Sequence, residues 1–311
     1  MGTRMTPGNS ILVIIDPTSQ EQPALGRAAW IGTKLGFDLE LFVCEYDQYL
    51  AGERFFDSAA LDKARSDLLH RHMKRLEKLA SPLREQGLRV TIDVAWDHPL
   101  HEGILRKIER ANPNLVLKDT HFHSAIRRSV FSNTDWHLIR DCTALLWLVK
   151  PHQDPAIKKL LAAVDPLHER DKPARLDHKI LETAERIRAA AGAELDVVHG
   201  FDPAPAYAVS TDAMSFPITE PINDAVDALR SQHQAAMDEL VKKHPMIKPG
   251  HAHLMEGETR EVLVGAVDDL GADLVVIGAV SRTVLKRLVL GSTAERVLDF
   301  VPCDLLIVKP D

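Results

Sequence analysis

Cysteine is scarce in this chain, and long apolar runs are missing. Three cysteines, Cys44, Cys142 and Cys303, are spread far apart over 311 residues, which excludes a disulfide-stapled scaffold and favours a reducing compartment. No stretch approaches the roughly 20 consecutive apolar residues that a membrane-spanning helix needs. The first ten residues, MGTRMTPGNS, also carry no apolar core of a secretion signal. We therefore expect a soluble protein without a membrane span.

A strong charge of one sign is missing as well. The net charge is −7, with 38 Lys and Arg residues interspersed among 45 Asp and Glu residues. Such a mixture provides no broad cationic surface for a phosphate backbone. Nucleic acid is therefore not an expected partner.

What the sequence does contain is an internal repeat of domain length. Asn114 to Lys118 aligns with Asp273 to Ile277, and Leu148 to Pro151 aligns with Ile307 to Pro310 at the same shift. Self-similarity over this length indicates a duplicated domain rather than a solenoid of short repeats. We place the domains at residues 1–152 and 153–311, divided in the PHQDP segment.

Each half alternates short apolar runs with longer amphipathic ones. The short runs predict ten strands, at residues 11–15, 39–44, 88–95, 114–118, 144–149, 159–164, 194–200, 250–255, 273–277 and 304–309. Their continuous apolar character is typical of buried parallel strands. Two helical patterns have apolar residues spaced along one face, the first at Leu61, Leu68, Leu69, Met73, Leu76 and Leu79, and the second at Ala225, Leu229, Ala236 and Leu240.

Strict alternation of strand and helix predicts an α/β fold with right-handed crossovers. We expect two tandem, doubly wound domains of the flavodoxin or Rossmann type, each with a five-stranded parallel sheet. In such folds a ligand binds beyond the carboxyl ends of the strands where the strand order reverses. In a flavodoxin-like order, this point lies between the first and fourth strands, so Asp165 and the loop after Ile277 should meet there.

The loop of the second half has features of an anion site. Gly278 directly follows the strand predicted at residues 273–277 and allows the backbone to approach a ligand closely. Farther on, Gly291-Ser292 begins a helix, whose first N–H groups and positive dipole end attract anions. Ser292 and Glu295 also form an S-x-x-E capping box, so Ser292 has a purely structural interpretation too.

These residues carry a family resemblance. Gly278-x-x-Ser281, nine further residues and then Gly291-Ser292 resemble the G-x2-G-x9-G-[ST] nucleotide loop of universal stress proteins. The strand before this loop, the aspartate after the first strand and the closing LLIVKP are similar to that family too. The tandem arrangement, with a degenerate first half, most resembles the E-type members. The resemblance covers essentially the whole chain.

The resemblance implies a cytoplasmic stress-response protein that acts by binding ATP or AMP in its second domain. The residues that would contact the nucleotide are Asp165, Gly200, Gly278, Ser281, Gly291, Ser292 and Thr293. Ser281 departs from the family glycine and adds a side chain beside the phosphate path. The resemblance also implies that the two halves pack as an intramolecular pseudo-dimer. It leaves open an unknown protein partner and a homodimer of tandem chains. The alternative is a nucleotide-free stress-response interaction protein.

The first half departs much further from the nucleotide pattern. Asp119, Phe122, Ser132 and Asn133 stand at the positions of the loop residues. A carboxylate at Asp119 would repel phosphate, and Phe122 would fill the space that an anion needs. Asp16 is retained, although an aspartate there can simply anchor the following turn. We therefore expect residues 1–152 to serve as a scaffold or partner surface rather than to bind nucleotide.

No catalytic residue is predicted. The motifs G-x-S-x-G, H-E-x-x-H and G-x-x-x-x-G-K-[ST] are all missing. The sequence therefore gives no support for a hydrolase or a motor NTPase of the usual classes. At most we expect slow ATP hydrolysis, because no residue is placed as a general base.

Two other ligands are weighed. His121 with His123, and His251 with His253, each place two imidazoles on one side of an extended segment, and His98 and His101 could join the first pair as zinc ligands. Neither pair has an obvious third ligand in sequence, and no metal is required by the fold. The long, apolar, proline-interrupted segment at residues 201–221 could cover a hydrophobic cavity beside the nucleotide site, which would suit an amphipathic, nucleotide-lipid-like ligand.

Overall fold

A computed structural model describes residues 9–51, 58–120, 133–151, 154–167, 175–204, 220–279 and 300–310. The chain forms two compact units, Met1–Ala156 and Ile157–Asp311. The boundary expected from the sequence, after residue 152, lies four residues before this division.

The first unit is a parallel five-stranded sheet with helices between its strands. Its strands are β1 (Ser10–Ile14), β2 (Asp38–Glu45), β3 (Val90–Trp96), β4 (Leu115–Asp119) and β5 (Leu145–Val149). Its described helices are α1 (Pro23–Leu35), α2 (Gln48–Ala51), α3 (Ser58–Glu85), α4 (Leu100–Ala111) and α5 (Asn133–Asp141). The strand order is β3-β2-β1-β4-β5, so the order reverses between β1 and β4 as predicted.

The second unit repeats this plan. Its strands are β6 (Lys159–Ala163), β7 (Glu194–Phe201), β8 (Ala252–Glu256), β9 (Leu274–Gly278) and β10 (Asp304–Val308). Its described helices are α6 (Leu176–Ala191), α8 (Glu220–Lys242) and α9 (Thr259–Leu270). The strand order is β10-β9-β6-β7-β8, with the reversal between β6 and β9. The doubly wound α/β fold predicted from the sequence is therefore confirmed in both units.

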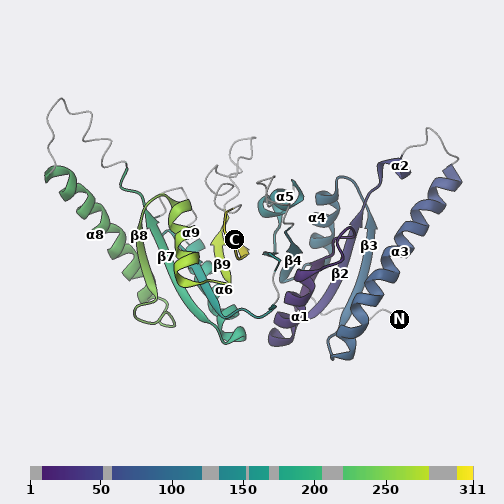
Figure 1. Cartoon of the computed structure of the whole chain (residues 1–311), viewed down its shortest axis with the longest axis horizontal. Helices are drawn as coiled ribbons and strands as arrows, with labels where there is room; N and C mark the ends of the chain where they lie inside the picture. Colours follow the sequence, from purple (N-terminus) through teal and green to yellow (C-terminus); the bar gives the residue numbers. More distant parts are fainter. Residues whose placement is uncertain are drawn as a thin grey trace, which may run out of the picture. The chain divides into compact units, whose positions relative to one another are not determined.

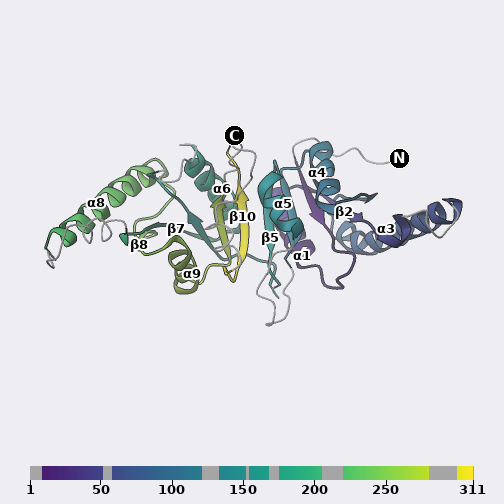
Figure 2. The same ribbon diagram turned by 90° about the horizontal axis from the view of Figure 1, so that it is seen from above.

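Burial of both sheet faces explains the apolar strands. In the first unit α1 and α3 cover one face of the sheet, and α4 and α5 cover the other; in the second unit α6 and α8 lie on one face and α9 on the other (Figures 1 and 2). All five residues of β1 and of β10 are buried. Continuous apolar runs are therefore required, rather than the alternation that a one-sided sheet would show.

The predicted buried faces of two helices need correction. On α3, Met73 is exposed, and the neighbouring His72 is buried instead, with its Nε2 atom 2.9 Å from Glu45 Oε2. On α8, Ala225 is exposed and Val226 is buried. His72 can occupy the buried position because Glu45 is its hydrogen-bond partner, although the pattern of apolar residues favours Met73 there.

The duplication extends to helix ends. The helix after each first strand ends in a left-handed glycine, Gly36 at φ 68° and Gly192 at φ 70°. At the ends of α4 and α9, Asn112 and Gly271 occupy the same left-handed conformation. This conformation is favourable for glycine and tolerated by asparagine, so both units stop corresponding helices in the same way.

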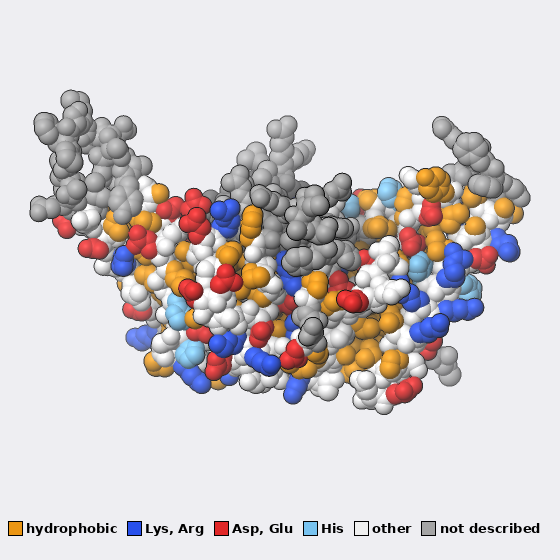
Figure 3. All heavy atoms as spheres, in the orientation of Figure 1, with side chains coloured by type: hydrophobic (Ala, Val, Ile, Leu, Met, Phe, Trp, Pro, Cys, Tyr) orange, Lys and Arg blue, Asp and Glu red, His pale blue; other side chains and the backbone are white. Residues whose placement is uncertain are grey.

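Charged groups of both signs are scattered over the visible face of the molecule (Figure 3). On the face that Figure 3 shows, Lys and Arg side chains are interspersed with Asp and Glu side chains over both units. In the part of the chain that the structure describes, no helix is both long and apolar enough to cross a membrane.

Candidate functional site

The switch point of the second unit lies at the carboxyl ends of β6 and β9. Ala163 pairs with Ile277 in the parallel register, so Asp165 and Ala279 follow from adjacent strand ends. The backbone N–H of Asp165 donates to Asp177 Oδ1 at 3.1 Å, and Asp177 is buried in the first turn of α6. A second carboxylate thus stands directly beside Asp165.

The Asp165 carboxylate has a buried acceptor. Its Oδ1 atom is buried and accepts no hydrogen bond from the residues that the structure describes. Asp16, at the same place in the first unit, differs: its Oδ1 accepts from the Thr18 N–H at 2.6 Å and from Thr18 Oγ1 at 2.7 Å. Leu167 stands where Thr18 would be and offers no hydroxyl. Asp16 therefore anchors its own turn, whereas Asp165 Oδ1 accepts no such bond from the residue two positions later.

A buried histidine pair lies behind this aspartate. His199 Nδ1 is 3.1 Å from the Val164 carbonyl oxygen, and His199 Nε2 is 2.6 Å from His233 Nδ1. If Nδ1 of His199 donates to the carbonyl, its Nε2 accepts a hydrogen bond from His233 Nδ1. Burial lowers the pKa of His199, while the nearby Asp165 opposes that shift. This pair was not predicted from the sequence, where its only local signal is a histidine directly after two valines in a strand.

The two glycines predicted to face the nucleotide also serve packing. A Cβ atom on Gly278 would lie 2.8 Å from Leu176 Cδ2, and one on Gly200 would lie 3.0 Å from Val262 Cγ1. Gly278 ends β9 and Gly200 lies within β7, paired with Met255. Both glycines let a helix approach the sheet closely. The other predicted site residues, Ser281, Gly291, Ser292 and Thr293, lie outside the described residues, as do Glu295 and, in the first unit, Phe122 and Ser132.

The first unit fills its switch point with its own charges. Asp119, at the place of Gly278, is buried, and its Oδ1 accepts a hydrogen bond from the Ala24 N–H in the first turn of α1 at 2.5 Å. Lys118 Nζ lies 2.7 Å from Asp135 Oδ1 and donates to the Asp119 carbonyl oxygen at 3.0 Å. The Asp119 carboxylate thus occupies the N-terminus of α1, a position that attracts anions.

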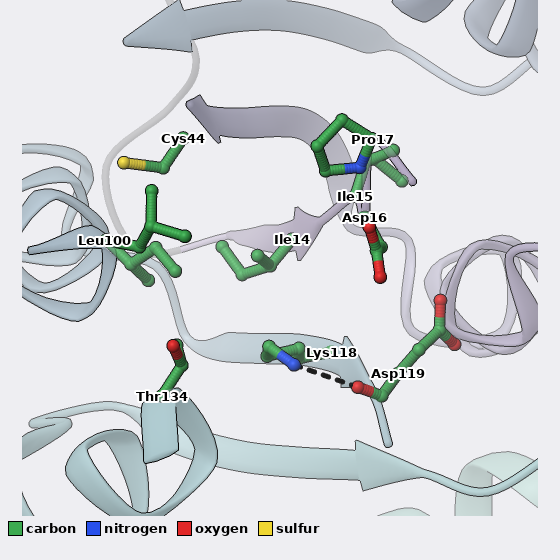
Figure 4. A pocket seen from close by; sticks show the side chains of 10 residues that line it. Ile14, Ile15, Asp16, Pro17, Cys44, Leu100, Lys118, Asp119 and Thr134 are labelled. Atoms are coloured by element: carbon green, nitrogen blue, oxygen red, sulfur yellow. Dashed lines mark hydrogen bonds between the residues drawn. The ribbon is translucent and has the colours of Figure 1, made fainter. Parts of the chain in front are cut away.

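A cavity of about 180 Å³ adjoins these groups. It is lined by Ile14, Ile15, Asp16, Pro17, Cys44, Leu100, Ile104, Lys118, Asp119 and Thr134. Figure 4 shows Leu100 and Cys44 at one end, Asp16 and Asp119 at the other, and Ile14 between them. Burial raises the pKa of the Cys44 thiol to about 12, so this cysteine is a neutral part of the wall and not a nucleophile. Sequence reasoning did not anticipate this cavity.

The histidines considered for zinc that the structure describes have other partners. His251 Nδ1 and His253 Nε2 both contact the same oxygen, Asp196 Oδ1, at 3.0 and 2.8 Å. His98 stacks on Tyr46. His121 and His123 lie outside the described residues. Among the residues that are described, no group of three or more His, Cys, Asp or Glu side chains is arranged to hold a metal ion.

The comparison with protein families decides the family. The model of the universal stress protein family matches residues 9–150 and again residues 156–309. The chain belongs to the universal stress protein family. It carries two tandem domains of that family, one in each compact unit.

Relatives of the same tandem length are found in bacteria. Universal stress protein E of Escherichia coli K12 is 31% identical over 303 residues, covering 97% of this chain and 94% of that protein. The universal stress protein E homolog of Haemophilus influenzae is 25% identical over 318 residues, covering 97% of each. A crystal structure of a functionally unknown protein from Pseudomonas aeruginosa PAO1 has a TM-score of 0.68 at 27% identity, covering 97% of this chain and 93% of that one.

Proposed function

We propose that this tandem universal stress protein acts by binding an ATP- or AMP-type nucleotide in its second domain, with the first domain as a scaffold or partner surface. The observation that carries the proposal is the buried Asp165 Oδ1 atom, which accepts no hydrogen bond from the described residues. A buried acceptor without a donor costs about 1 to 3 kcal/mol. A ribose hydroxyl is a donor of suitable size at a site beside the ends of β6 and β9.

The contrast between the two units supports this assignment. At the corresponding strand end, the second unit has Gly278, which presents no side chain, whereas the first unit has the Asp119 carboxylate. A carboxylate disfavours phosphate at short range. The nucleotide therefore belongs in the second unit, and one site per chain is expected.

His199 has a supporting role in this proposal. Its contact with the Val164 carbonyl holds the backbone directly before Asp165. The imidazoles of His199 and His233 are both buried, and burial lowers the pKa of His199, which disfavours a positive charge on that ring beside the carboxylate.

Isothermal titration calorimetry of the full chain with ATP and with AMP tests the proposal. We expect heat of binding with a stoichiometry of one nucleotide per chain. A folded sample that gives no heat at millimolar nucleotide overturns the proposal and leaves the nucleotide-free interaction protein. Two equivalent sites per chain would contradict the assignment to the second domain alone.

A further inference from the structure

We infer that a groove on the second unit, between α9 and the outermost strand β8, docks a basic peptide segment of a partner protein. The groove has a volume of about 370 Å³. It is lined by Met255, Glu256, Glu261, Val262, Gly265, Ala266 and Asp269. The inference is independent of the nucleotide site proposed above, since it rests on a comparison of α9 with α4, the corresponding helix of the first unit.

The two helices correspond residue by residue. Both have 12 residues, and the shift between them, 159 positions (259 − 100), is also the shift from Asn114 to Asp273 in the segments that follow (273 − 114). At this shift α4 has Arg106, Lys107 and Arg110 where α9 has Gly265, Ala266 and Asp269. Three cations of the first unit are thus replaced by two small residues and a carboxylate.

In the first unit, cationic side chains of α4 reach the carboxylates around them. Arg106 Nη1 lies 3.2 Å from Glu102 Oε2, one turn earlier on the same helix. Lys107 is buried, and its Nζ atom lies 2.6 Å from Glu40 Oε1 on β2 and 2.8 Å from Asp93 Oδ2 on β3. The first unit therefore provides its own cations at this place.

The second unit does not provide them. Glu261 corresponds to Glu102, but the residue one turn later is Gly265, and a Cβ atom there would have no atom within 4 Å. Glycine is a poor helix former, and no described residue packs against this position. Among the residues that the structure describes, neither the Glu261 nor the Asp269 carboxylate forms a hydrogen bond or an ion pair. Both side chains are exposed and can receive a cation from outside.

The other lining residues suit the stem of a long basic side chain. Met255 is half-buried and Val262 is buried, so apolar surface lies beside the carboxylates. Arginine and lysine pack their aliphatic stems on such surface and keep the charged end in a polar environment. Of the described residues that line the groove, three are acidic and none is basic; one of the three, Glu256, is paired with Arg230 at 2.5 Å.

The distance between the two unpaired carboxylates defines the segment. Glu261 and Asp269 are eight positions apart on α9 (269 − 261), which is about 12 Å along the helix axis at about 1.5 Å per residue. An extended peptide advances about 3.3 Å per residue, so basic residues at positions i and i+4 lie about 13 Å apart on one side of it. An apolar residue at i+2 points to that same side and can contact the floor of the groove.

The test measures the binding of rhodamine-labelled pentapeptides to the full chain by fluorescence anisotropy. We expect RALAR to bind at least about fivefold more tightly than QALAQ, which corresponds to about 1 kcal/mol for two exposed ion pairs. The isomer RRALA, with the wrong spacing, should bind more weakly than RALAR, and EALAE should not bind. No binding of RALAR to the folded wild type, or equal affinities of RALAR and either QALAQ or RRALA, overturns the inference.

Substitutions at Gly265 locate the binding. Gly265→Arg gives α9 the cation that α4 has in Arg106, so it should abolish binding of RALAR. The change introduces a better helix former into open space and should not prevent folding. Gly265→Ala, the matched control, leaves the carboxylates unpaired and should bind RALAR within about twofold of the wild type. Unchanged binding in Gly265→Arg contradicts the inference.

A pair of adjacent charge reversals separates the groove from the overall charge. Asp269→Lys should weaken RALAR binding at least about fivefold, whereas Asp268→Lys, which changes the net charge equally but does not line the groove, should stay within about twofold. Equal losses in the two variants overturn the inference. So does self-association of the wild type that Gly265→Arg abolishes while RALAR fails to bind, because a second copy would then occupy the groove. Circular dichroism verifies that each variant is folded.

Discussion

The Asp119 carboxylate accepts a hydrogen bond from the backbone N–H of Ala24, across 95 positions of sequence. The residue before α1, Gln22, provides no side-chain cap of its own. A side chain at the end of β4 therefore caps the helix that follows β1. The same carboxylate occupies the switch point of the first unit, where the strand order reverses between β1 and β4.

Replacing Asp119 tests this cap. Asp119→Ala should lower the free energy of unfolding of the first unit by about 1 kcal/mol, the usual contribution of an N-terminal cap. Asp119→Asn should lose less, because its amide oxygen can still accept from Ala24. All four tryptophans, Trp30, Trp96, Trp136 and Trp147, lie in this unit, so tryptophan fluorescence during urea unfolding follows it selectively. Equal losses for Ala and Asn would show that the carboxyl oxygen does not act as a cap.

Gly278 provides a second prediction. A Cβ atom there would lie 2.8 Å from Leu176 Cδ2 and 3.0 Å from Ile180 Cδ1. Gly278→Ala should therefore destabilise the second unit by about 1 to 3 kcal/mol through overpacking. Because the crowded atoms are side-chain ends, adding Leu176→Ala should make the double variant less destabilised than the sum of the two single variants, by at least about 0.5 kcal/mol. Denaturant unfolding followed by circular dichroism measures this coupling, and strict additivity would contradict the packing role.

The buried imidazole pair predicts a dependence on pH. Burial lowers the pKa of His199 in the folded chain below the ordinary value of about 6.5. At a pH between these two pKa values, the unfolded chain therefore binds more protons than the folded chain. The resulting stability is fully present above about pH 6.5 and is lost as the pH falls through the lowered pKa. His137 and His244 shift in the same direction.

A variant separates His199 from the other histidines. Urea unfolding at several pH values between about 8 and 5.5 should show a shallower loss of stability for His199→Gln than for the wild type. The slope is the readout, because the substitution can also lower stability at every pH. An unchanged slope would mean that His199 is not the group responsible.

Much of the fold could be predicted because strand burial leaves a direct mark on the sequence. Runs such as Ile11 to Ile14 and Leu305 to Val308 are apolar at consecutive positions, since helices cover both sheet faces. The placement of Asp165 beside the end of β9 followed from the predicted strand order. The inward positions of α3 and α8 were harder to predict, because His72 and His233 are buried through polar partners.

The details of the site depend on contacts between distant residues. Cys44 and Gly200 occupy equivalent strand positions, and the size of each is matched on the facing helix: a Cβ on Gly103 of α4 would lie 2.6 Å from Cys44 Sγ, whereas Val262 of α9 faces Gly200. In the first unit the small residue is Gly103 on the helix, and in the second unit it is Gly200 on the strand. A single sequence shows each glycine but not its partner, so Gly200 and Gly278 were interpreted through a ligand alone.

Asp16 and Asp165, the two aspartates after the first strand of each unit, also differ in a way that the sequence alone does not show. Both were visible in the sequence, but the difference between them lies in the residue two positions later. Thr18 donates twice to Asp16, whereas Leu167 cannot donate to Asp165. The structure was needed to show that one carboxylate is engaged by its own turn and that the other has a buried oxygen accepting no bond from the described residues.

The most direct test of the account compares these two aspartates by calorimetric titration with ATP. Asp165→Ala should weaken ATP binding by about 10- to 100-fold, because a hydrogen bond to a charged acceptor contributes about 1.5 to 3 kcal/mol. Asp16→Ala, the matched change in the first unit, should leave the affinity within about twofold of the wild type, because its carboxylate serves a local turn. Equal losses in the two variants, or no binding to the folded wild type at millimolar ATP, would contradict the central claim.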